Sequence, residues 1–132
     1  MAAKVPVLVA DDEPLIRSLV EEALSDGGFA VISATGGDEA IRQFDANASE
    51  VQAIVVDVRL GDGTDGWEVA RHAREANANV AVVYMSGDSA GQWTSQGVPN
   101  SLMLQKPFTP AQVVTAVASL LNQVAPSGPP PS

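Results

Sequence analysis

The sequence predicts an α/β fold in which a parallel β-sheet carries helices on both faces. Short apolar runs alternate five times with longer segments whose apolar residues recur at helical spacing, which is typical of this fold class. The run Ala53–Val56 is too short for a helix and is rich in β-branched residues, as expected of a strand that is buried on both faces. Polar or charged residues follow four of the runs, and in open α/β sheets ligands bind at that edge.

Composition limits the classes of function. The 132 residues suit one domain, which we expect to span residues 1–124, followed by a Pro-rich disordered tail at 125–132. The lack of cysteine excludes disulfides and thiolate metal sites and fits a cytoplasmic protein. A formal charge of −9 with only seven Lys and Arg argues against nucleic-acid binding. No apolar run approaches the roughly 18 residues that span a bilayer, and the N-terminus has no apolar signal segment, so neither a membrane partner nor export is expected.

The first repeat of the alternation is a strand at Val5–Ala10 and a helix that begins near Pro14. Proline suits the first turn of a helix, and the acidic residues before it favour the positive helix N-terminus. Apolar residues then recur at helical spacing as far as Leu24, and Asp26-Gly27-Gly28 ends the helix.

The second repeat has a strand at Phe29–Ala34 and a weaker helix. The loop Thr35–Asp38 holds two glycines and precedes a short apolar stripe. We expect this helix to run to about Ala48.

The third repeat begins with the buried strand already described. The stretch Leu60–Gly66 holds three glycines and two aspartates, so we predict a loop there. Thr64 or Asp65 can cap the helix that follows. Its inner face is predicted to comprise Trp67, Val69, Ala70, Ala73 and Ala76.

The last two repeats are less regular. A strand is predicted at Val80–Met85, but Ser89–Gln96 has few apolar residues and would form only a short helix. The fifth strand is predicted at Leu102–Gln105. Thr109-Pro110 then offers a hydroxyl cap followed by proline, which predicts a last helix extending to Val124.

Four of the predicted strands deliver polar side chains to one edge of the sheet. Asp11 and Asp12 follow the first strand, Asp57 the third, Ser86 the fourth and Lys106 the fifth. Three carboxylates at one edge repel each other, and Lys106 supplies only one positive charge. A divalent cation would supply the rest, and oxygen ligands without Cys or a nearby His suit Mg²⁺ or Mn²⁺ better than Zn²⁺.

These residues suit the transfer of a phosphoryl group to a carboxylate. A carboxylate can accept the group as an acyl phosphate, and the reaction needs little more than in-line positioning and neutralisation of charge. We expect Asp57 to be the nucleophile, with Asp11 and Asp12 on the metal. Lys106 and Ser86 would then contact the phosphoryl oxygens.

Four motifs at strand ends carry a family resemblance: Leu8–Pro14, Ile54–Asp57, Tyr84–Gly87 and Leu104–Phe108. Each alone is weak, but in this order they resemble the receiver domain of two-component response regulators, of the CheY-like superfamily. The resemblance runs from about Val5 to Val124, nearly the whole chain. It implies a doubly wound, flavodoxin-like sheet of five parallel strands in the order 2-1-3-4-5, with helices on both faces.

The resemblance also implies a role for each acidic residue of the site. Asp57 matches the aspartate that is phosphorylated in this family. Asp11 and Asp12 match the acidic pair that holds Mg²⁺, with Asp12 as the more direct ligand. Asp57 and the backbone carbonyl of Arg59 would complete the protein ligands of the metal.

Other matching positions concern the switch and the lysine. Ser86 takes the place of the family's switch hydroxyl, and Lys106 that of its active-site lysine. The resemblance also implies that the Lys106-Pro107 peptide bond is cis, a form whose cost proline lowers. Three residues before the lysine the family usually has Tyr or Phe, but this chain has Met103, whose thioether lacks the aromatic rotamer signal.

The chain departs from the family pattern in three further places. Leu60-Gly61 replaces the usual Met-Pro in a loop that is one residue longer, so we expect a more mobile loop. The segment before the lysine is short, which predicts an abbreviated or distorted fourth helix. Trp93 has few apolar neighbours there, and exposure at an interaction surface is the alternative to burial in the core. Arg59 and Asp88 occupy the variable positions that flank the site, and we hypothesise that they form an ion pair that restricts the approach of water to the acyl phosphate.

We therefore expect a stand-alone response regulator, or a piece of a longer one, that accepts a phosphoryl group from a sensor histidine kinase or a histidine phosphotransfer protein. It would bind a downstream protein target or act as a phosphate relay or sink, and it would catalyse only its own phosphorylation and dephosphorylation. A phosphorylation-independent scaffold is the alternative that Met103 and the altered fourth helix favour. A phosphatase-like hydrolase is a third possibility, although such enzymes usually carry a second aspartate where this chain has Arg59.

Overall fold

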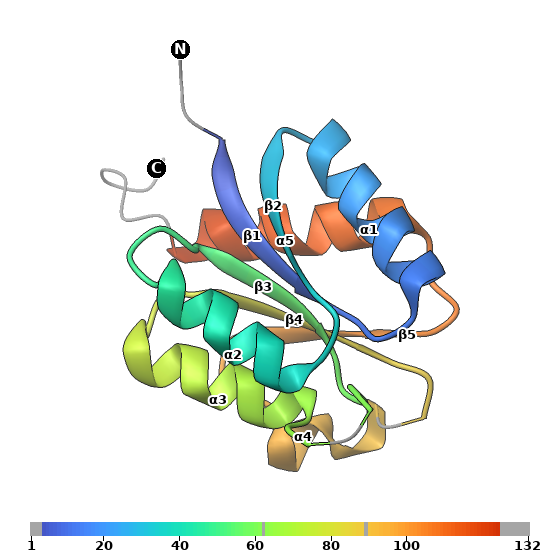
Figure 1. Ribbon diagram of the computed structural model, residues 1–132. Coiled ribbons are helices and arrows are strands. Elements are labelled where there is room, and N and C mark those ends of the chain that lie inside the picture. Colours follow the sequence, from blue (N-terminus) through green and yellow to red (C-terminus); the bar gives the residue numbers. More distant parts are fainter. Residues whose placement is uncertain (1–3, 62, 89, 125–132) are drawn as a thin grey trace, which may run out of the picture.

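Five parallel strands form one sheet in the order β2-β1-β3-β4-β5 (Figure 1). The strands are β1 (Val5–Ala10), β2 (Phe29–Ala34), β3 (Ala53–Asp57), β4 (Ala81–Ser86) and β5 (Ser101–Gln105). The structure is a computed structural model and describes residues 4–61, 63–88 and 90–124. The strand order confirms the flavodoxin-like α/β fold that the sequence led us to expect.

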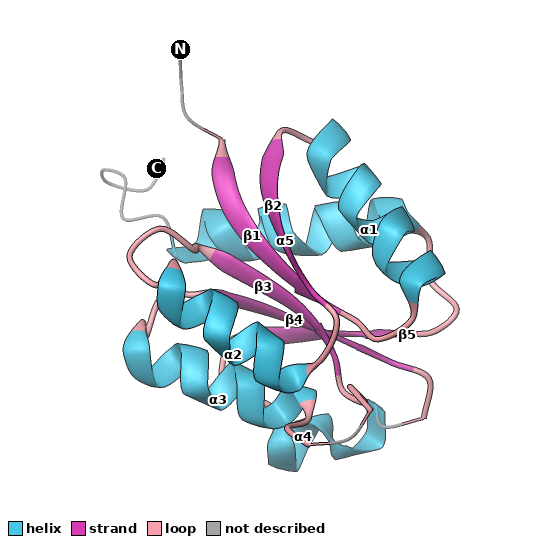
Figure 2. Cartoon of the chain, in the orientation of Figure 1, coloured by secondary structure: helices cyan, strands magenta, loops and turns pink. Residues whose placement is uncertain are grey.

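The long helices cover the two faces of the sheet in pairs (Figure 2). The helices are α1 (Pro14–Asp26), α2 (Gly37–Ala46), α3 (Gly66–Ala76), α4 (Trp93–Gln96) and α5 (Pro110–Val124). α1 and α5 pack on one face, and α2 and α3 pack on the other. α4 has only four residues and follows a 3-10 turn, which confirms the abbreviated fourth helix. Within the described ranges, no helix is both long and apolar enough to cross a membrane.

The core consists of two apolar layers that the central strands separate. Every residue of β3 and β4 is buried, because helices cover both faces of the sheet there. Side chains alternate along β3: Ile54 and Val56 face α2 and α3, whereas Ala53 and Val55 face α1 and α5. The continuous apolar run that marked this strand in the sequence therefore reflects burial on two sides.

Several helix starts have the caps that the sequence indicated. The Asp65 carboxylate accepts the backbone N–H of Glu68 at 2.9 Å and caps α3. At the start of α5, the backbone N–H of Thr109 donates to the Gln112 side chain at 2.7 Å, and the N–H of Gln112 donates to the Thr109 hydroxyl at 3.3 Å. This reciprocal capping box satisfies two donors that a helix end leaves without partners.

The predicted boundaries needed three corrections. α2 ends at Ala46 rather than near Ala48, because the Asn47 side chain donates to a carbonyl of the preceding turn at 2.8 Å and so competes with the helix. β4 starts and ends one residue later than predicted, at Ser86, and β5 starts one residue earlier, at Ser101. The predicted tail at 125–132 lies outside the described residues.

Candidate functional site

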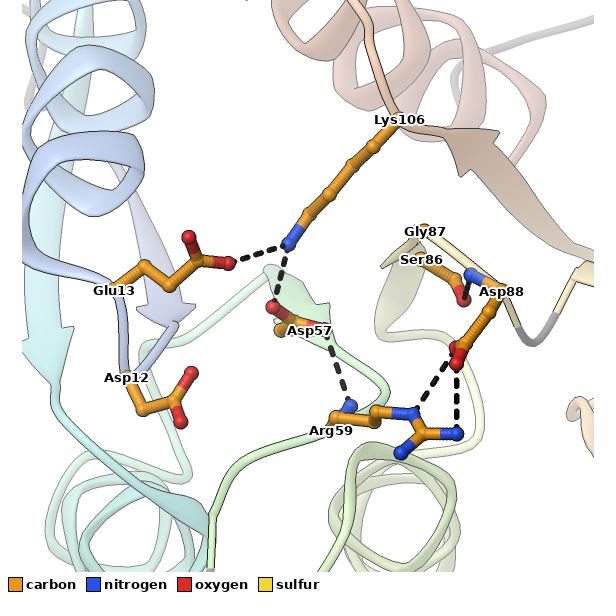
Figure 3. Close-up of a pocket in the computed structure, with 8 residues that line it drawn as sticks. All are labelled: Asp12, Glu13, Asp57, Arg59, Ser86, Gly87, Asp88 and Lys106. Carbon is orange, nitrogen blue, oxygen red and sulfur yellow. Dashed lines mark hydrogen bonds and ion pairs between the residues drawn. The ribbon is translucent and has the colours of Figure 1, made fainter.

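The carboxyl ends of β1, β3, β4 and β5 meet around an open pocket of about 400 Å³ (Figure 3). Its lining comprises Asp12, Glu13, Asp57, Arg59, Ser86, Gly87, Asp88 and Lys106. Parallel strands place their carboxyl ends at the same edge of the sheet, so residues far apart in sequence come together here. All the side chains that the sequence predicted for the site lie at this edge.

Asp57, the last residue of β3, lies at the centre of the pocket. The residue is 4% exposed, and its carboxylate bonds to Lys106 Nζ through Oδ2 at 2.8 Å. The other oxygen, Oδ1, accepts the backbone N–H of Arg59 at 3.1 Å. Burial raises the pKa of Asp57 above its ordinary value, although Lys106 and the Arg59 N–H act in the opposite direction. A poorly hydrated carboxylate next to one lysine is well placed to act as a nucleophile.

Lys106 is shared between two carboxylates. Besides Asp57, its ammonium group contacts Glu13 Oε1 at 3.1 Å (Figure 3). Partial burial alone would lower the pKa of Lys106, but the bonds to Asp57 and Glu13 raise it above the ordinary value, so the side chain remains charged. The Lys106-Pro107 bond is cis, as expected. Sequence reasoning gave Glu13 no contact with the lysine, because nothing local in the sequence shows which side chain of β1's acidic end faces β5.

Asp11, Asp12 and Asp57 form a group with the spacing of a metal site. One carboxylate oxygen of each lies within 4.8 Å of the others. Asp11 is fully buried, and burial raises its pKa to about 6. Its Oδ1 accepts the backbone N–H of Glu13, but Oδ2 has no hydrogen-bond partner among the described residues. A buried carboxylate oxygen without a partner is costly unless a cation uses it, so these residues fit a hard divalent ion such as Mg²⁺.

Ser86 ends β4 on the opposite side of Asp57 from Glu13 (Figure 3). It is 1% exposed, and its hydroxyl oxygen accepts the backbone N–H of Asp88 at 3.2 Å. Ser86 therefore lines the same pocket as Asp57.

The hypothesised ion pair between Arg59 and Asp88 is present. The guanidinium contacts the carboxylate twice, Nε to Oδ1 at 3.0 Å and Nη2 to Oδ2 at 2.7 Å (Figure 3). The pair joins the loops that follow β3 and β4, and both side chains remain largely exposed, at 75% and 57%. Its presence is confirmed, whereas its effect on water remains a prediction.

Trp93 and Met103 lie outside the pocket and pack against the core. Of the two alternatives for Trp93, the structure shows partial burial: it packs against the core on the α2 and α3 side, and its indole N–H donates to Ser101 Oγ at 2.9 Å. The poor apolar content of α4 did not decide between these alternatives, because the core cluster and Ser101 supply the neighbours of Trp93. Met103 lies in β5 opposite Tyr84 of β4 and packs against the same layer.

Comparison with known proteins gives a consistent family. The model of the response regulator receiver domain matches residues 7–118. The chain is 34% identical over 121 residues to the transcriptional regulatory protein ResD of Bacillus subtilis and 31% identical over 119 residues to the transcriptional regulatory protein TrcR of Mycobacterium tuberculosis. These alignments cover 90% and 89% of this chain but 49% and 45% of the relatives, so the chain spans about half the length of the curated relatives it matches.

A solved structure agrees over nearly the whole chain. The crystal structure of a response regulator receiver protein from Sinorhizobium medicae is 44% identical and superimposes with a TM-score of 0.88. The match covers 92% of this chain and 97% of that one.

Proposed function

The chain belongs to the response regulator receiver domain family of two-component systems, and on that premise we propose that Asp57 accepts a phosphoryl group in the presence of Mg²⁺. The observation that carries this proposal is the pairing of Asp57 with Lys106 beside a buried oxygen of Asp11 that has no hydrogen-bond partner in the part of the chain that the structure describes. The Lys106 ammonium holds the nucleophile, Asp57, and the Asp11 carboxylate is suited to bind a metal. In this family a phosphorylated aspartate, a lysine and an acidic metal ligand generally act together, and Asp57, Lys106 and Asp11 are the matching side chains here.

The transfer can be written in balanced steps. A carboxylate oxygen of Asp57 attacks phosphorus, the bond from phosphorus to the donor's nitrogen breaks, and the leaving imidazole takes the electron pair. Lys106 would contact the new phosphoryl oxygens, and Ser86 would donate a hydrogen bond to one of them. A bound Mg²⁺ would neutralise charge on those oxygens. Water later cleaves the acyl phosphate and returns the carboxylate and inorganic phosphate.

The proposed donor is a histidine of a sensor histidine kinase or of a histidine phosphotransfer protein. An apolar surface beside the pocket supports a protein donor. Leu15 and Leu19 of α1 are 74% and 48% exposed, one helical turn apart. They adjoin a groove of about 420 Å³ lined by Ile16, Leu19, Val20, Lys106, Pro107, Phe108 and Pro110. Because Lys106 lines both the groove and the pocket, a helix packed there would bring its histidine close to Asp57.

The proposed output is binding to a downstream protein or relay of the phosphoryl group, either as a stand-alone regulator or within a longer one. The domain would catalyse only its own phosphorylation and dephosphorylation, in the cytoplasm. Arg59 stands two residues after Asp57, where a phosphatase-like hydrolase would carry an acid, and its side chain is engaged by Asp88. Met103 favours one alternative function, a scaffold that works without phosphorylation.

Intact-protein mass spectrometry tests the proposal. The protein is incubated with phosphoramidate and Mg²⁺, with Asp57→Asn as the matched variant and EDTA as the metal control. We expect the mass of one phosphoryl group to be gained by the parent with Mg²⁺ and by neither control. A folded parent that gains no mass would refute phosphoryl acceptance and favour the scaffold, whereas turnover of a phosphomonoester would favour the hydrolase.

A further inference from the structure

The hydroxyl of Tyr84 connects the strand that carries Ser86 to the segment that follows α4. Tyr84 is fully buried in β4, and it accepts the backbone N–H of Val98 at 3.0 Å. It lies two residues before Ser86, so the two side chains point to the same face of the sheet. Ser86 in turn accepts the N–H of Asp88, before α4. Two side chains of one strand thus hold backbone groups on either side of α4.

Tyr84 also supplies an aromatic ring on β4, next to a position of β5 that holds the thioether of Met103. Its ring packs against Trp67 of α3, with ring centroids 4.6 Å apart and planes inclined at 56°. In the parallel register Tyr84 lies opposite Met103, the position at which similar proteins usually have Tyr or Phe. Methionine has neither a ring nor a hydroxyl, so it cannot make a directed bond to α4. The directed bond comes from the neighbouring strand instead.

α4 depends on such ties for its position. A helix of four residues is too short to be stable alone, and α4 buries none of its side chains fully. Trp93 is tied to Ser101, whose hydroxyl donates to the Val98 carbonyl at 2.6 Å. Arg71 of α3 donates to the Gln96 carbonyl at 3.3 Å. Among these ties, the bond from Tyr84 is the one that begins on the strand carrying Ser86.

We propose that Tyr84 is a positioning residue that couples the state of the Asp57 site to the position of α4. The proposal rests on the proposed function, because it needs a phosphoryl group, or a mimic of one, next to Ser86. When Ser86 turns to donate to that group, the end of β4 and the backbone beyond it shift together. The Tyr84–Val98 bond then transmits the shift to the far end of α4, so that both ends of the helix respond. Since β3 and β4 are buried on both faces, small displacements of these strands carry their packed neighbours with them.

Backbone NMR of the ¹⁵N-labelled protein tests this coupling, with BeF₃⁻ and Mg²⁺ as the mimic of the phosphoryl group. The amides of Arg59 and Asp88 report the site, the Val98 amide reports the segment after α4, and the Trp93 indole, which bonds Ser101, reports α4 itself. In the parent we expect all four signals to shift on activation. In Tyr84→Phe, which keeps the ring, the site signals should shift as before, and those of Val98 and Trp93 should shift less than half as far.

A matched control separates coupling from general loosening of α4. Arg71→Gln removes a tie to the same helix that does not begin on β4, and it should leave the Val98 response to BeF₃⁻ unchanged. Because coupling is reciprocal, Tyr84→Phe should also change the apparent affinity for BeF₃⁻ by roughly two- to tenfold, the range of one neutral hydrogen bond. A residue with only a structural role would lower the melting temperature and leave both readouts as in the parent.

The outcomes distinguish the coupling through Tyr84 from the proposed function of Asp57. If the site signals of the parent do not respond to BeF₃⁻ and Mg²⁺, the proposed function fails and the coupling fails with it. If they respond but Val98 and Trp93 respond equally in Tyr84→Phe and the parent, the coupling through Tyr84 is overturned and the proposed function stands.

Discussion

Removing the Arg59 guanidinium is expected to shorten the lifetime of phosphorylated Asp57 by up to about fivefold while barely changing the stability of the fold. Arg59→Ala deletes the side chain that pairs with Asp88 across the pocket. It keeps the backbone N–H that bonds Asp57 Oδ1, and it keeps the backbone carbonyl proposed as a metal ligand. The perturbation is therefore confined to the ion pair.

The magnitude follows from the exposure of the pair. With side chains 75% and 57% exposed, the contacts at 2.7 and 3.0 Å are surrounded by water. Exposed pairs contribute about 0–1 kcal/mol to the free energy of unfolding. If water must displace the pair to reach phosphorus, loss of ~1 kcal/mol from the barrier raises the hydrolysis rate about fivefold. Salt at 1 M shortens the Debye length to about 3 Å, so the difference between parent and variant should shrink there.

The assay follows release of inorganic phosphate after phosphorylation with phosphoramidate and removal of the donor, in constant Mg²⁺. Asp88→Ala and the double variant complete a mutant cycle, and Asp88→Ala retains the N–H that bonds Ser86. If the two residues act as a pair, the double variant should hydrolyse no faster than the faster single variant. Equal rates for Arg59→Ala and the parent, or effects that simply add, would refute the reasoning.

Three further predictions concern the metal-free site, the first residue of α3 and a helix cap. Burial raises the pKa of Asp11 in the folded protein to about 6, from its ordinary value of 3.8. The folded metal-free protein therefore binds this proton more tightly than the unfolded chain does. As a result, the free energy of unfolding should fall as the pH rises from about 4 to about 6. Urea unfolding in EDTA should show that Asp11→Asn gains stability relative to the parent over that window, and a difference that does not vary with pH would contradict this assignment. Gly66→Ala should destabilise the fold and slow phosphoryl acceptance, because its Cβ would clash with the Asp57 carbonyl oxygen. A Cβ at Gly91 meets nothing within 4 Å, so equal effects of Gly66→Ala and Gly91→Ala would contradict the argument. Thr109→Ala should lower the free energy of unfolding by about 0.5–2 kcal/mol through loss of the capping box, measured by the same urea titration.

Local features of the sequence were enough for the elements and for the edge that carries the site. Strands that are buried on both faces need continuous apolar residues, so the run Ala53–Val56 was visible without any partner. Caps involve residues three positions apart, so Asp65 and Thr109 could be assigned from short windows. Element ends were off by one or two residues, because competition such as that of the Asn47 side chain depends on local geometry rather than on periodicity.

The order of the strands did not come from the alternation itself. The pattern of apolar runs gives parallel strands and helices but leaves their neighbours open, and the order 2-1-3-4-5 entered through the resemblance of the four motifs. The ion pair of Arg59 and Asp88 also entered that way, and the structure confirms it.

Partners between distant segments were decided only by the tertiary structure. Nothing in the sequence showed that Glu13 pairs with Lys106 or that the Tyr84 hydroxyl bonds to Val98. Nor did it show that one oxygen of Asp11 has no hydrogen-bond partner within the described residues. The physical reason is that periodicity and caps depend on neighbours within a few residues, whereas these contacts depend on strand register and on how closely side chains pack across the sheet. The sequence therefore determined which residues reach the carboxyl edge, and packing decided which of them touch.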